Sequence, residues 1–470
     1  MTFYDVSAFL DSKPAAIDDQ GRLVSYGDLS KLAYDFEKIL KPRSLAFLIC
    51  ENSIGSIAAF VTLVNSGVVP LLLDSAIDEN SLLNLIDTYR PDYIVDSAGQ
   101  SNRFIGYKSM ANFFDVELFQ KSHGGEAELN PELGLLMTTS GSTGSPKLVR
   151  QSYANLKSNG NAISKYLGLT GDERPITSLP MHYTFGLSII NSHIALGATI
   201  LVTKQPLLSK EFWNFVRAHE ATSLSGVPYS FEILSRIRFE NMDLPSLKTL
   251  TQAGGKMSNE LILKFLDISE RNNMKFFVMY GQTEATARMS YVPAGDLKNK
   301  IGSIGLPIPE GEFFITDVNG DLVDQSDVEG QLNYRGSNVA MGYALNREDL
   351  YKGDEWNGKL NTGDLAFRDL DGFYYITGRS NRFVKLFGKR VNLDDVESFV
   401  SAKFGECACL GSEDLVTVFI TQALDHKSIK SALSEWMGIN AVAYQVIELE
   451  SIPRNSTGKI EYRVLENKAG

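Results

Sequence analysis

The chain has 470 residues, which is long enough for two or more domains. Hydrophobic residues make up 43% and charged residues 22%, the profile of a folded globular protein rather than a disordered or fibrous one. The formal net charge of −12 argues against nucleic acid or an anionic membrane as the main partner, because both require a dense positive surface.

Cysteine usage and hydropathy give a first indication of location. Three cysteines, Cys50, Cys407 and Cys409, are too few for a disulfide framework and lack the spacing of a metal site. The N-terminus carries acids before any apolar run, unlike a signal peptide. The most apolar stretch, 56–73, is interrupted by polar residues, glycine and proline, so it predicts a buried helix and strand rather than a membrane span. We therefore expect a cytoplasmic protein.

Short apolar runs alternate with helical patterns over the first two thirds of the chain. The strand-like runs are 44–50, 68–74, 198–203 and 247–254, and the helical runs are 57–67, 212–220 and 261–273. This alternation favours an α/β architecture with largely parallel sheets.

The texture changes from about residue 300 to short strands with glycine and aspartate at turn positions. The last ninety residues contain a helical pattern at 394–404, a strand at 416–420 and a second helical pattern at 428–437. These elements are enough for a small α+β module at the C-terminus.

A loop rich in glycine and hydroxyl residues follows an apolar strand at 135–137. Residues 138–145 are all small, and Pro146 and Lys147 come next. Backbone N–H groups in such a loop can approach phosphate oxygens closely, while the hydroxyls add donors and the lysine adds charge. Pro146 excludes a Walker A loop. The alternative is a polar surface linker, which would seldom follow an apolar strand directly.

This segment, TTSGSTGSPK, resembles the phosphate loop of the acyl-adenylate-forming (AMP-binding) superfamily, which includes acyl-CoA synthetases, nonribosomal-peptide adenylation domains and luciferases. Other motifs of that superfamily follow in order over nearly the whole chain. They are YGQTEA at 280–285, EGQLNYRGSNVAMGYA at 329–344, NTGDLAF at 361–367, GRSNRFVKLFGKRVNLDDVE at 378–397 and IPRNSTGKI at 452–460, with weaker matches at 23–29 and 179–187.

The resemblance implies an α/β fold with a large N-terminal domain, residues 1–379, of parallel or mixed sheets with flanking helices and a small β-rich subdomain. A small, mobile α+β C-terminal domain, 380–470, would follow a hinge near Asn381, where asparagine tolerates unusual backbone angles. The implied reaction is ATP-dependent activation of a carboxylic acid to acyl-AMP with release of pyrophosphate, and then transfer to the thiol of coenzyme A.

The resemblance also assigns ligands for ATP and Mg²⁺, because the phosphates must be neutralised and the carboxylate held in line with the α-phosphorus. Thr283 would bind the α-phosphate, and Glu284 would position Mg²⁺. Lys459 would place its ammonium group between the substrate carboxylate and the α-phosphate. The remaining nucleotide residues are Thr139, Ser140, Gly141, Ser142, Thr143, Gly144 and Lys147 for the β- and γ-phosphates, Tyr280, Gly254 and Gly255 for adenine, and Asp364 and Arg379 for the ribose.

Each acidic or basic group has a structural alternative. Asp364 could be a turn aspartate after Gly363, Glu284 an acid at a helix start, and Lys459 a solvated lysine near the terminus. Inside their motifs the functional interpretation is favoured for all three.

The predicted acyl pocket is mostly small or apolar, which indicates an aryl or a short to medium acyl acid. Its residues are His182, Tyr183, Gly226, Val227, Pro228, Gln252, Ala253 and Gly281. His182 and Tyr183 could equally be packed aromatics. Thr184 follows Tyr183 where amino-acid-activating domains carry an aspartate, so an α-amino acid is disfavoured.

The sequence is compatible with several acceptors of the activated acyl group. Gly388 falls where the superfamily lines its pantetheine tunnel, and five basic residues in 379–390 could meet coenzyme A phosphates or an acidic carrier protein, or form a solvated face. The alternatives to coenzyme A are the phosphopantetheine of an acyl carrier protein, an enzyme that stops at acyl-AMP or passes it to an amine, and a non-catalytic relative that binds nucleotide or acyl ligand.

Overall fold

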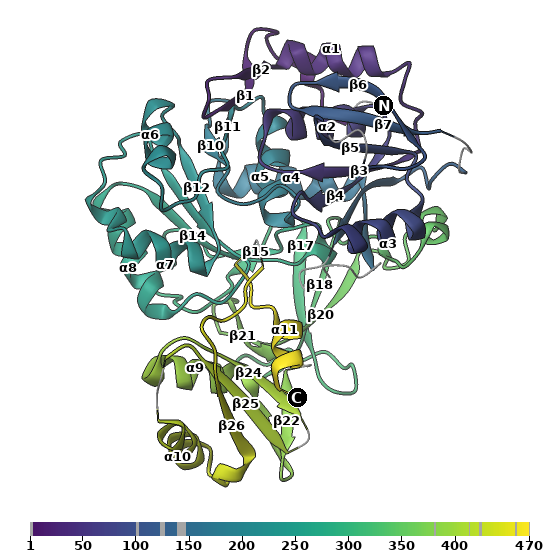
Figure 1. Cartoon of the computed structure of the whole chain (residues 1–470). Helices are drawn as coiled ribbons and strands as arrows, with labels where there is room; N and C mark the ends of the chain where they lie inside the picture. The colour runs from purple at the N-terminus through teal and green to yellow at the C-terminus, as the bar shows by residue number, and fades with distance from the viewer. Residues whose placement is uncertain are drawn as a thin grey trace. The chain divides into compact units, whose positions relative to one another are not determined.

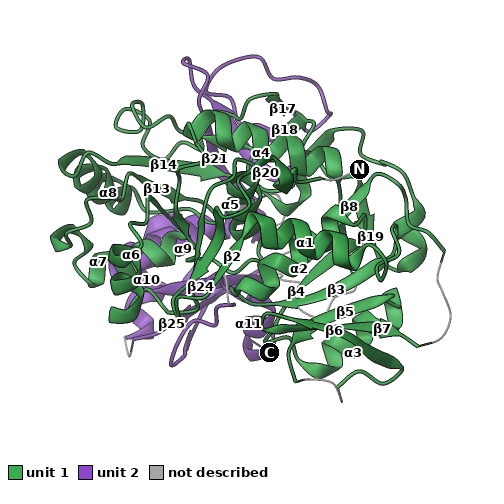
Figure 2. Cartoon of the chain, turned by 90° about the horizontal axis from the view of Figure 1, so that it is seen from above, with its two compact units in different colours: residues 1–312, 334–360 green, residues 313–333, 361–470 purple. Residues whose placement is uncertain are grey.

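The structure is a computed structural model that describes residues 3–99, 103–122, 127–138, 147–379, 382–412, 414–422, 425–455 and 458–469. The chain divides into two compact units. Unit 1 comprises residues 1–312 and 334–360, and unit 2 comprises residues 313–333 and 361–470 (Figure 2).

A nine-stranded sheet forms one half of unit 1. Its strands from β14 to β1 run parallel, and antiparallel strands complete both edges. In spatial order they are β16 (Leu306–Pro307), β15 (Ser290–Tyr291), β14 (Lys275–Tyr280), β13 (Thr249–Gln252), β12 (Ser223–Gly226), β10 (Pro175–Ile176), β11 (Ile200–Val202), β1 (Pro14–Asp18) and β2 (Leu23–Ser25). Helices α6 (Lys210–Ala218), α7 (Pro228–Arg236) and α8 (Asn259–Arg271) connect successive strands (Figure 1).

An eight-stranded mixed sheet forms the other half, with β8, β4, β3 and β5 parallel at its centre. In spatial order its strands are β19 (Gly342–Ala344), β9 (Leu148–Ser152), β8 (Leu133–Thr138), β4 (Val69–Asp74), β3 (Leu45–Cys50), β5 (Tyr93–Ser97), β7 (Val116–Lys121) and β6 (Tyr107–Phe113). All six residues of β3 are buried. Its alternate residues enter two different core clusters, as expected for a strand with both faces covered.

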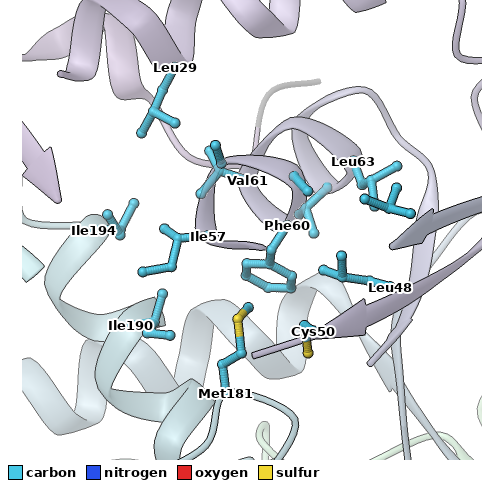
Figure 3. Packing of buried hydrophobic residues seen from close by; sticks show 14 of the residues in the cluster. Leu29, Leu48, Cys50, Ile57, Phe60, Val61, Leu63, Met181, Ile190 and Ile194 are labelled. Atoms are coloured by element: carbon cyan, nitrogen blue, oxygen red, sulfur yellow. The ribbon is translucent and has the colours of Figure 1, made fainter. Parts of the chain in front are cut away.

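Two helices in unit 1 are buried on every side. All residues of α2 (Ile54–Asn65) and α5 (Thr184–Ile194) are buried. Figure 3 shows Ile57 and Phe60 of α2 packed with Ile190 of α5 and Leu48 of β3, and the same cluster includes residues of β1 and β11. Such all-round burial explains why the 57–64 segment is apolar except for Thr62. The remaining helices of unit 1 are α1 (Tyr26–Phe36), α3 (Glu79–Tyr89) and α4 (Tyr153–Leu167).

Unit 2 carries a four-stranded sheet and a small α+β region. The four strands are β17 (Gly311–Thr316), β18 (Gly330–Gly336), β20 (Lys359–Arg368) and β21 (Tyr374–Arg379). The α+β region contains the hairpin β22 (Phe383–Leu386) and β23 (Lys389–Asn392), the sheet of β24 (Cys407–Ser412), β25 (Leu415–Ile420) and β26 (Tyr444–Glu448), and helices α9 (Leu393–Phe404), α10 (His426–Met437) and α11 (Tyr462–Ala469). Apolar residues of α9 and α10 share one core with β24 and β25.

The predicted strand and helix segments are confirmed, and so is the fold class of mixed sheets with flanking helices. The four-stranded sheet belongs to unit 2 together with the C-terminal residues, whereas the predicted boundary after residue 379 places this sheet in the N-terminal domain. The predicted domain boundary and the mobility of the C-terminal domain stay predictions, and the predicted hinge residue Asn381 lies outside the described residues. No helix within the described ranges combines the length and apolar character needed to span a lipid bilayer.

Candidate active site

The carboxyl ends of three neighbouring parallel strands bring the predicted pocket residues together. Gly226, the last residue of β12, is the register partner of Gln252, the last residue of β13. Gln252 in turn faces Val278 near the end of β14. Ligands of open α/β sheets bind beyond such strand ends, and Val227 and Ala253 come directly after them.

Two glycines after β13 permit a close approach of the backbone to this pocket. Gly254 has a φ of +84°, and a Cβ there would lie 2.4 Å from the Tyr183 hydroxyl oxygen and 3.2 Å from Cγ1 of Val227. A Cβ on Gly255 would lie 3.2 Å from Cγ of Pro228. The backbone angle and the close contacts favour glycine at position 254, whereas a Cβ at position 255 would be in tight contact with Pro228.

The two aromatic pocket residues have different surroundings. Tyr183 precedes α5 and packs against the cluster that contains Val227 and Ala253, and burial raises the pKa of its hydroxyl well above the usual range. Nε2 of His182 lies 3.3 Å from Oδ2 of Asp74, at the end of β4 in the other sheet. Burial lowers the pKa of His182, while the Asp74 charge partly opposes this shift. The structure thus places Tyr183 against the cluster of Val227 and Ala253, and His182 beside Asp74.

The YGQTEA segment forms a short loop that other segments brace. Thr283 and Glu284 lie in a 3-10 turn, η3 (Thr283–Ala285), and the hydroxyl oxygen of Thr283 is 3.0 Å from that of Thr184. Nε2 of Gln151 donates hydrogen bonds to the carbonyl oxygens of Thr283 and Thr286, at 3.0 and 3.3 Å. The same loop requires glycine at Gly281, where a Cβ would meet the carbonyl oxygen of Ala287 at 1.8 Å.

Tyr343 joins two of the predicted phosphate and metal residues. Its hydroxyl donates a hydrogen bond to Oε1 of Glu284 at 2.9 Å, and Nζ of Lys147 lies 3.6 Å from the centroid of its ring. Burial raises the pKa of Tyr343, and the negative charge of Glu284 adds to the rise. Sequence reasoning missed Tyr343 as a site residue, although it is the tyrosine of the 329–344 motif.

The ends of the glycine-rich loop are fixed by strand pairing. Thr138, the last residue of β8, pairs with Leu148, the first residue of β9. The predicted phosphate ligands Thr139, Ser140, Gly141, Ser142, Thr143 and Gly144 lie outside the described residues. Lys147 lies within the described residues, and its ammonium group contacts the ring of Tyr343.

Replacing Tyr343 with phenylalanine is expected to raise the Mg²⁺ concentration for half-maximal adenylation by about 10-fold, because groups that orient a metal ligand typically contribute 10- to 100-fold in affinity. The phenyl ring retains the contact with Lys147, so ATP binding without metal should change little. Initial rates of pyrophosphate exchange across a Mg²⁺ titration measure this effect. The exposed Tyr34 offers a matched Tyr→Phe control. An unchanged Mg²⁺ dependence would show that the hydroxyl does not orient Glu284.

In unit 2, Asp364 and Arg379 form a cross-strand pair between β20 and β21. Nε of Arg379 donates to Oδ1 of Asp364 at 3.0 Å; the Asp364 side chain is 3% exposed and that of Arg379 is 58% exposed. Asp364 lies within a strand, so the alternative reading as a turn aspartate is not supported. The two residues predicted to bind one sugar are therefore adjacent.

Lys459 belongs to a closed loop between β26 and α11. The backbone N–H of Lys459 donates to Oδ1 of Asn455 at 3.0 Å, and the N–H of Asn455 donates to the carbonyl oxygen of Lys459 at 2.9 Å. Arg454 forms an isolated bridge with Ile460 and an ion pair with Glu406 at 2.8 Å. Hydrogen bonds to Asn455 thus hold the backbone of Lys459, so Lys459 does not lie on a frayed tail.

Gly388 lies at the tip of the β22–β23 hairpin. It has a φ of +86° after Phe387 at 49°, the left-handed pair that a two-residue hairpin turn prefers. The neighbouring basic residues do not all face solvent, because Arg382 is held in ion pairs with Asp394 and Glu397 at 2.9 and 2.6 Å. Arg382 is therefore neither part of a solvated basic face nor available to bind an anion, the two interpretations of residues 379–390, because carboxylates of the chain already pair with it.

The sequence of this chain is similar to those of known enzymes. The family model described as AMP-binding enzyme matches residues 6–344. The chain is 26% identical to the 2-succinylbenzoate–CoA ligase of Bacillus velezensis (strain DSM 23117 / BGSC 10A6 / LMG 26770 / FZB42) over 77% of this chain and 76% of the relative. It is 28% identical to the 4-coumarate–CoA ligase-like 2 protein of Arabidopsis thaliana over 91% and 80% of the two chains.

Solved structures share the fold. The o-succinylbenzoate CoA synthetase of Bacillus subtilis, in complex with its acyl-adenylate intermediate, superposes with a TM-score of 0.80 at 20% identity, covering 98% of this chain and 96% of that one. ATP-bound MatB from Rhodopseudomonas palustris has a TM-score of 0.80 at 21% identity, with 99% and 98% covered.

Proposed function

Because this chain belongs to the AMP-binding enzyme family, we propose that it is an AMP-forming acid–CoA ligase. In the first half-reaction a carboxylate oxygen attacks the α-phosphorus of ATP, and pyrophosphate leaves. In the second, the sulfur of the coenzyme A thiol attacks the acyl carbonyl, its proton is lost, and AMP leaves as the thioester forms. The observation that carries this proposal is the convergence of the YGQTEA loop, Gly254, Gly255 and the predicted acyl pocket at one edge of the nine-stranded sheet.

The described residues fit a magnesium–nucleotide complex. Mg²⁺ prefers oxygen ligands and is usually held by one or two carboxylates together with substrate phosphates. Within the described ranges no cluster of three or more His, Cys, Asp or Glu side chains could hold a metal by itself, so Glu284 would share Mg²⁺ with the phosphates of ATP. When bound, Mg²⁺ would neutralise phosphate charge. Glu284 would hold it, and the hydrogen bond from Tyr343 would fix the orientation of the Glu284 carboxylate.

The superfamily motifs assign the other nucleotide contacts. Thr283 binds the α-phosphate, and Tyr280 stacks on adenine beside Gly254 and Gly255. Residues 139–144 and Lys147 contact the β- and γ-phosphates. Asp364 accepts hydrogen bonds from the ribose hydroxyls, for which a carboxylate has two acceptor oxygens. Lys459 stabilises the charge that develops between the carboxylate and the α-phosphate.

The acid is an aryl or a short to medium acyl carboxylic acid. Two related ligases are named for aryl acids, 2-succinylbenzoate and 4-coumarate, and both are named as ligases of coenzyme A. Coenzyme A is accordingly the leading acceptor, with Gly388 near its tunnel and Asn381 at the hinge between the half-reactions. Loading of an acyl carrier protein is the second candidate, and the cytoplasmic location stays a prediction.

Pyrophosphate exchange tests the proposal without a choice of acceptor. The enzyme is incubated with ATP, Mg²⁺, labelled pyrophosphate and one acid at a time from a panel of aryl, short acyl, medium acyl and amino acids. We expect label to enter ATP with aryl or acyl acids and not with α-amino acids. Exchange with no acid, although ATP binds, would favour the non-catalytic alternative. Coenzyme A and a phosphopantetheinylated carrier protein, added separately to the active acid, then distinguish the two acceptors by thioester formation.

A further inference from the structure

Arg288 is a buried cation in the segment that follows the YGQTEA loop. It is 3% exposed and lies two residues before β15. Its Nε donates to Oγ of Ser188 at 3.2 Å, and its Nη1 donates to the Tyr166 hydroxyl at 3.1 Å and to Sδ of Met279 at 3.4 Å. Its Cζ lies 5.0 Å from the centroid of the Phe185 ring. All of these contacts are with neutral groups.

The charge of Arg288 is not balanced by a carboxylate anywhere in the described ranges, and its Nη2 donates no hydrogen bond to a described residue. The nearby His193 does not alter this balance, because burial lowers its pKa to about 4 and it is neutral at pH 7. Two other buried arginines of unit 1 behave differently: Arg150 is paired with Glu355 and Arg347 with Asp92. A buried charge costs free energy unless it is paired, so an arginine without an acidic partner requires a reason.

The neighbours of Arg288 fix the direction of its guanidinium. The Tyr166 hydroxyl donates to Sδ of Met279 at 3.1 Å, and the Ser188 hydroxyl donates to the carbonyl oxygen of Phe185 at 2.7 Å. Each hydroxyl therefore uses its proton elsewhere and presents a lone pair to the guanidinium. This leaves the two N–H groups of Nη2 as donors for a further acceptor.

Arg288 contacts residues that pack together with the predicted acyl pocket. Phe185 and Met279, which contact its side chain, belong to the same apolar cluster as the pocket residues Val227 and Ala253. Tyr183 and Tyr166 pack against that cluster. The guanidinium of Arg288 thus lies against the cluster that lines the predicted acyl pocket. The carboxylate that reacts with ATP is held at the nucleotide, so a guanidinium at this cluster would meet another part of the acid.

We propose that Arg288 binds a second anionic group of the substrate, a carboxylate distant from the one that is adenylated, and so selects dicarboxylic acids. This inference rests on the proposed function and narrows its substrate class. The planar guanidinium suits a carboxylate because two parallel N–H donors can meet its two oxygens. Binding of such an acid supplies the negative charge that no described residue provides to Arg288.

The test compares each acid with an analogue that lacks the distal charge. Aryl and aliphatic dicarboxylic acids of several lengths are assayed by pyrophosphate exchange beside their monomethyl esters, blocked at the distal carboxyl. The wild-type enzyme should favour at least one diacid over its ester by about 10²-fold in kcat/KM, because a buried donor left unpaired rejects the analogue. Arg288→Met should remove this preference, and Arg288→Lys should retain part of it. The exposed Arg236 supplies a control, Arg236→Met, that should keep the wild-type preference.

The outcomes separate this inference from the proposed function. If the wild-type enzyme exchanges label equally well with monocarboxylic acids or esters, the ligase assignment stands and the role of Arg288 is wrong. If Arg288→Met lowers exchange with every acid in parallel and also lowers the melting temperature, Arg288 is a structural residue. If no acid supports exchange with the wild-type enzyme, the proposed function fails and the inference fails with it. The comparison of diacid with ester needs no variant, so a misfolded Arg288→Met protein would not prevent the test.

Discussion

Lys459→Ala is expected to lower carboxylate-dependent pyrophosphate exchange by about 10²- to 10³-fold, the usual effect of removing one group that stabilises transition-state charge. The loss should appear in kcat, while the dissociation constant for ATP changes little, since the ammonium group acts where charge develops during the reaction. Exchange kinetics and equilibrium binding of ATP, measured on the same preparation, separate these effects.

The control for Lys459 is Lys468→Ala, which removes an exposed lysine on α11 in the same part of the chain. It should leave exchange unchanged. The backbone N–H and carbonyl groups of Lys459 form hydrogen bonds with Asn455 that an alanine preserves, so the fold of unit 2 should persist. Near-normal exchange in Lys459→Ala would mean that another cation contacts the α-phosphate and that the catalytic assignment is wrong.

Asp364→Asn is expected to raise the KM for ATP by about 10- to 100-fold, because an amide replaces a carboxylate that accepts hydrogen bonds from both ribose hydroxyls; bonds to charged groups contribute about 1.5–3 kcal/mol each. The amide has nearly the same volume as the carboxylate, so the packing of β20 should remain. The KM values for ATP and for 2′-deoxy-ATP provide the measurement. Wild-type enzyme should discriminate between the two nucleotides, and the variant should discriminate less.

Arg379→Ala provides the comparison for Asp364. The Arg379 side chain is 58% exposed and its partner carboxylate is buried, so its loss should have a smaller effect on KM than the loss of the carboxylate. If Asp364→Asn and wild type discriminate equally between ATP and 2′-deoxy-ATP, Asp364 does not contact the ribose, and its ion pair with Arg379 serves only to join β20 to β21.

Local sequence patterns were sufficient to predict most of the fold. The β3 segment is apolar throughout because both faces of its sheet are covered, and α2 is mostly apolar because it is buried on all sides. The order of strands and helices, and the contiguous motifs such as YGQTEA and IPRNSTGKI, are properties of neighbouring residues, so they can be read along the chain. The family relationship follows from those motifs and is confirmed by the family match.

The assembly of the site depended on contacts between distant segments. Tyr343, Lys147 and Glu284 come from three separate parts of unit 1. No spacing rule in the sequence predicts that Tyr343 contacts both of the others. Likewise, Arg288 reads in the sequence as one more surface arginine, and only burial and the absence of a carboxylate among its described neighbours set it apart. The sequence by itself determined the elements, the family and the nucleotide motifs, because these depend on short-range patterns. Tertiary packing decided which side chains meet and which charge stays unpaired, because burial and pairing arise only when remote segments pack together.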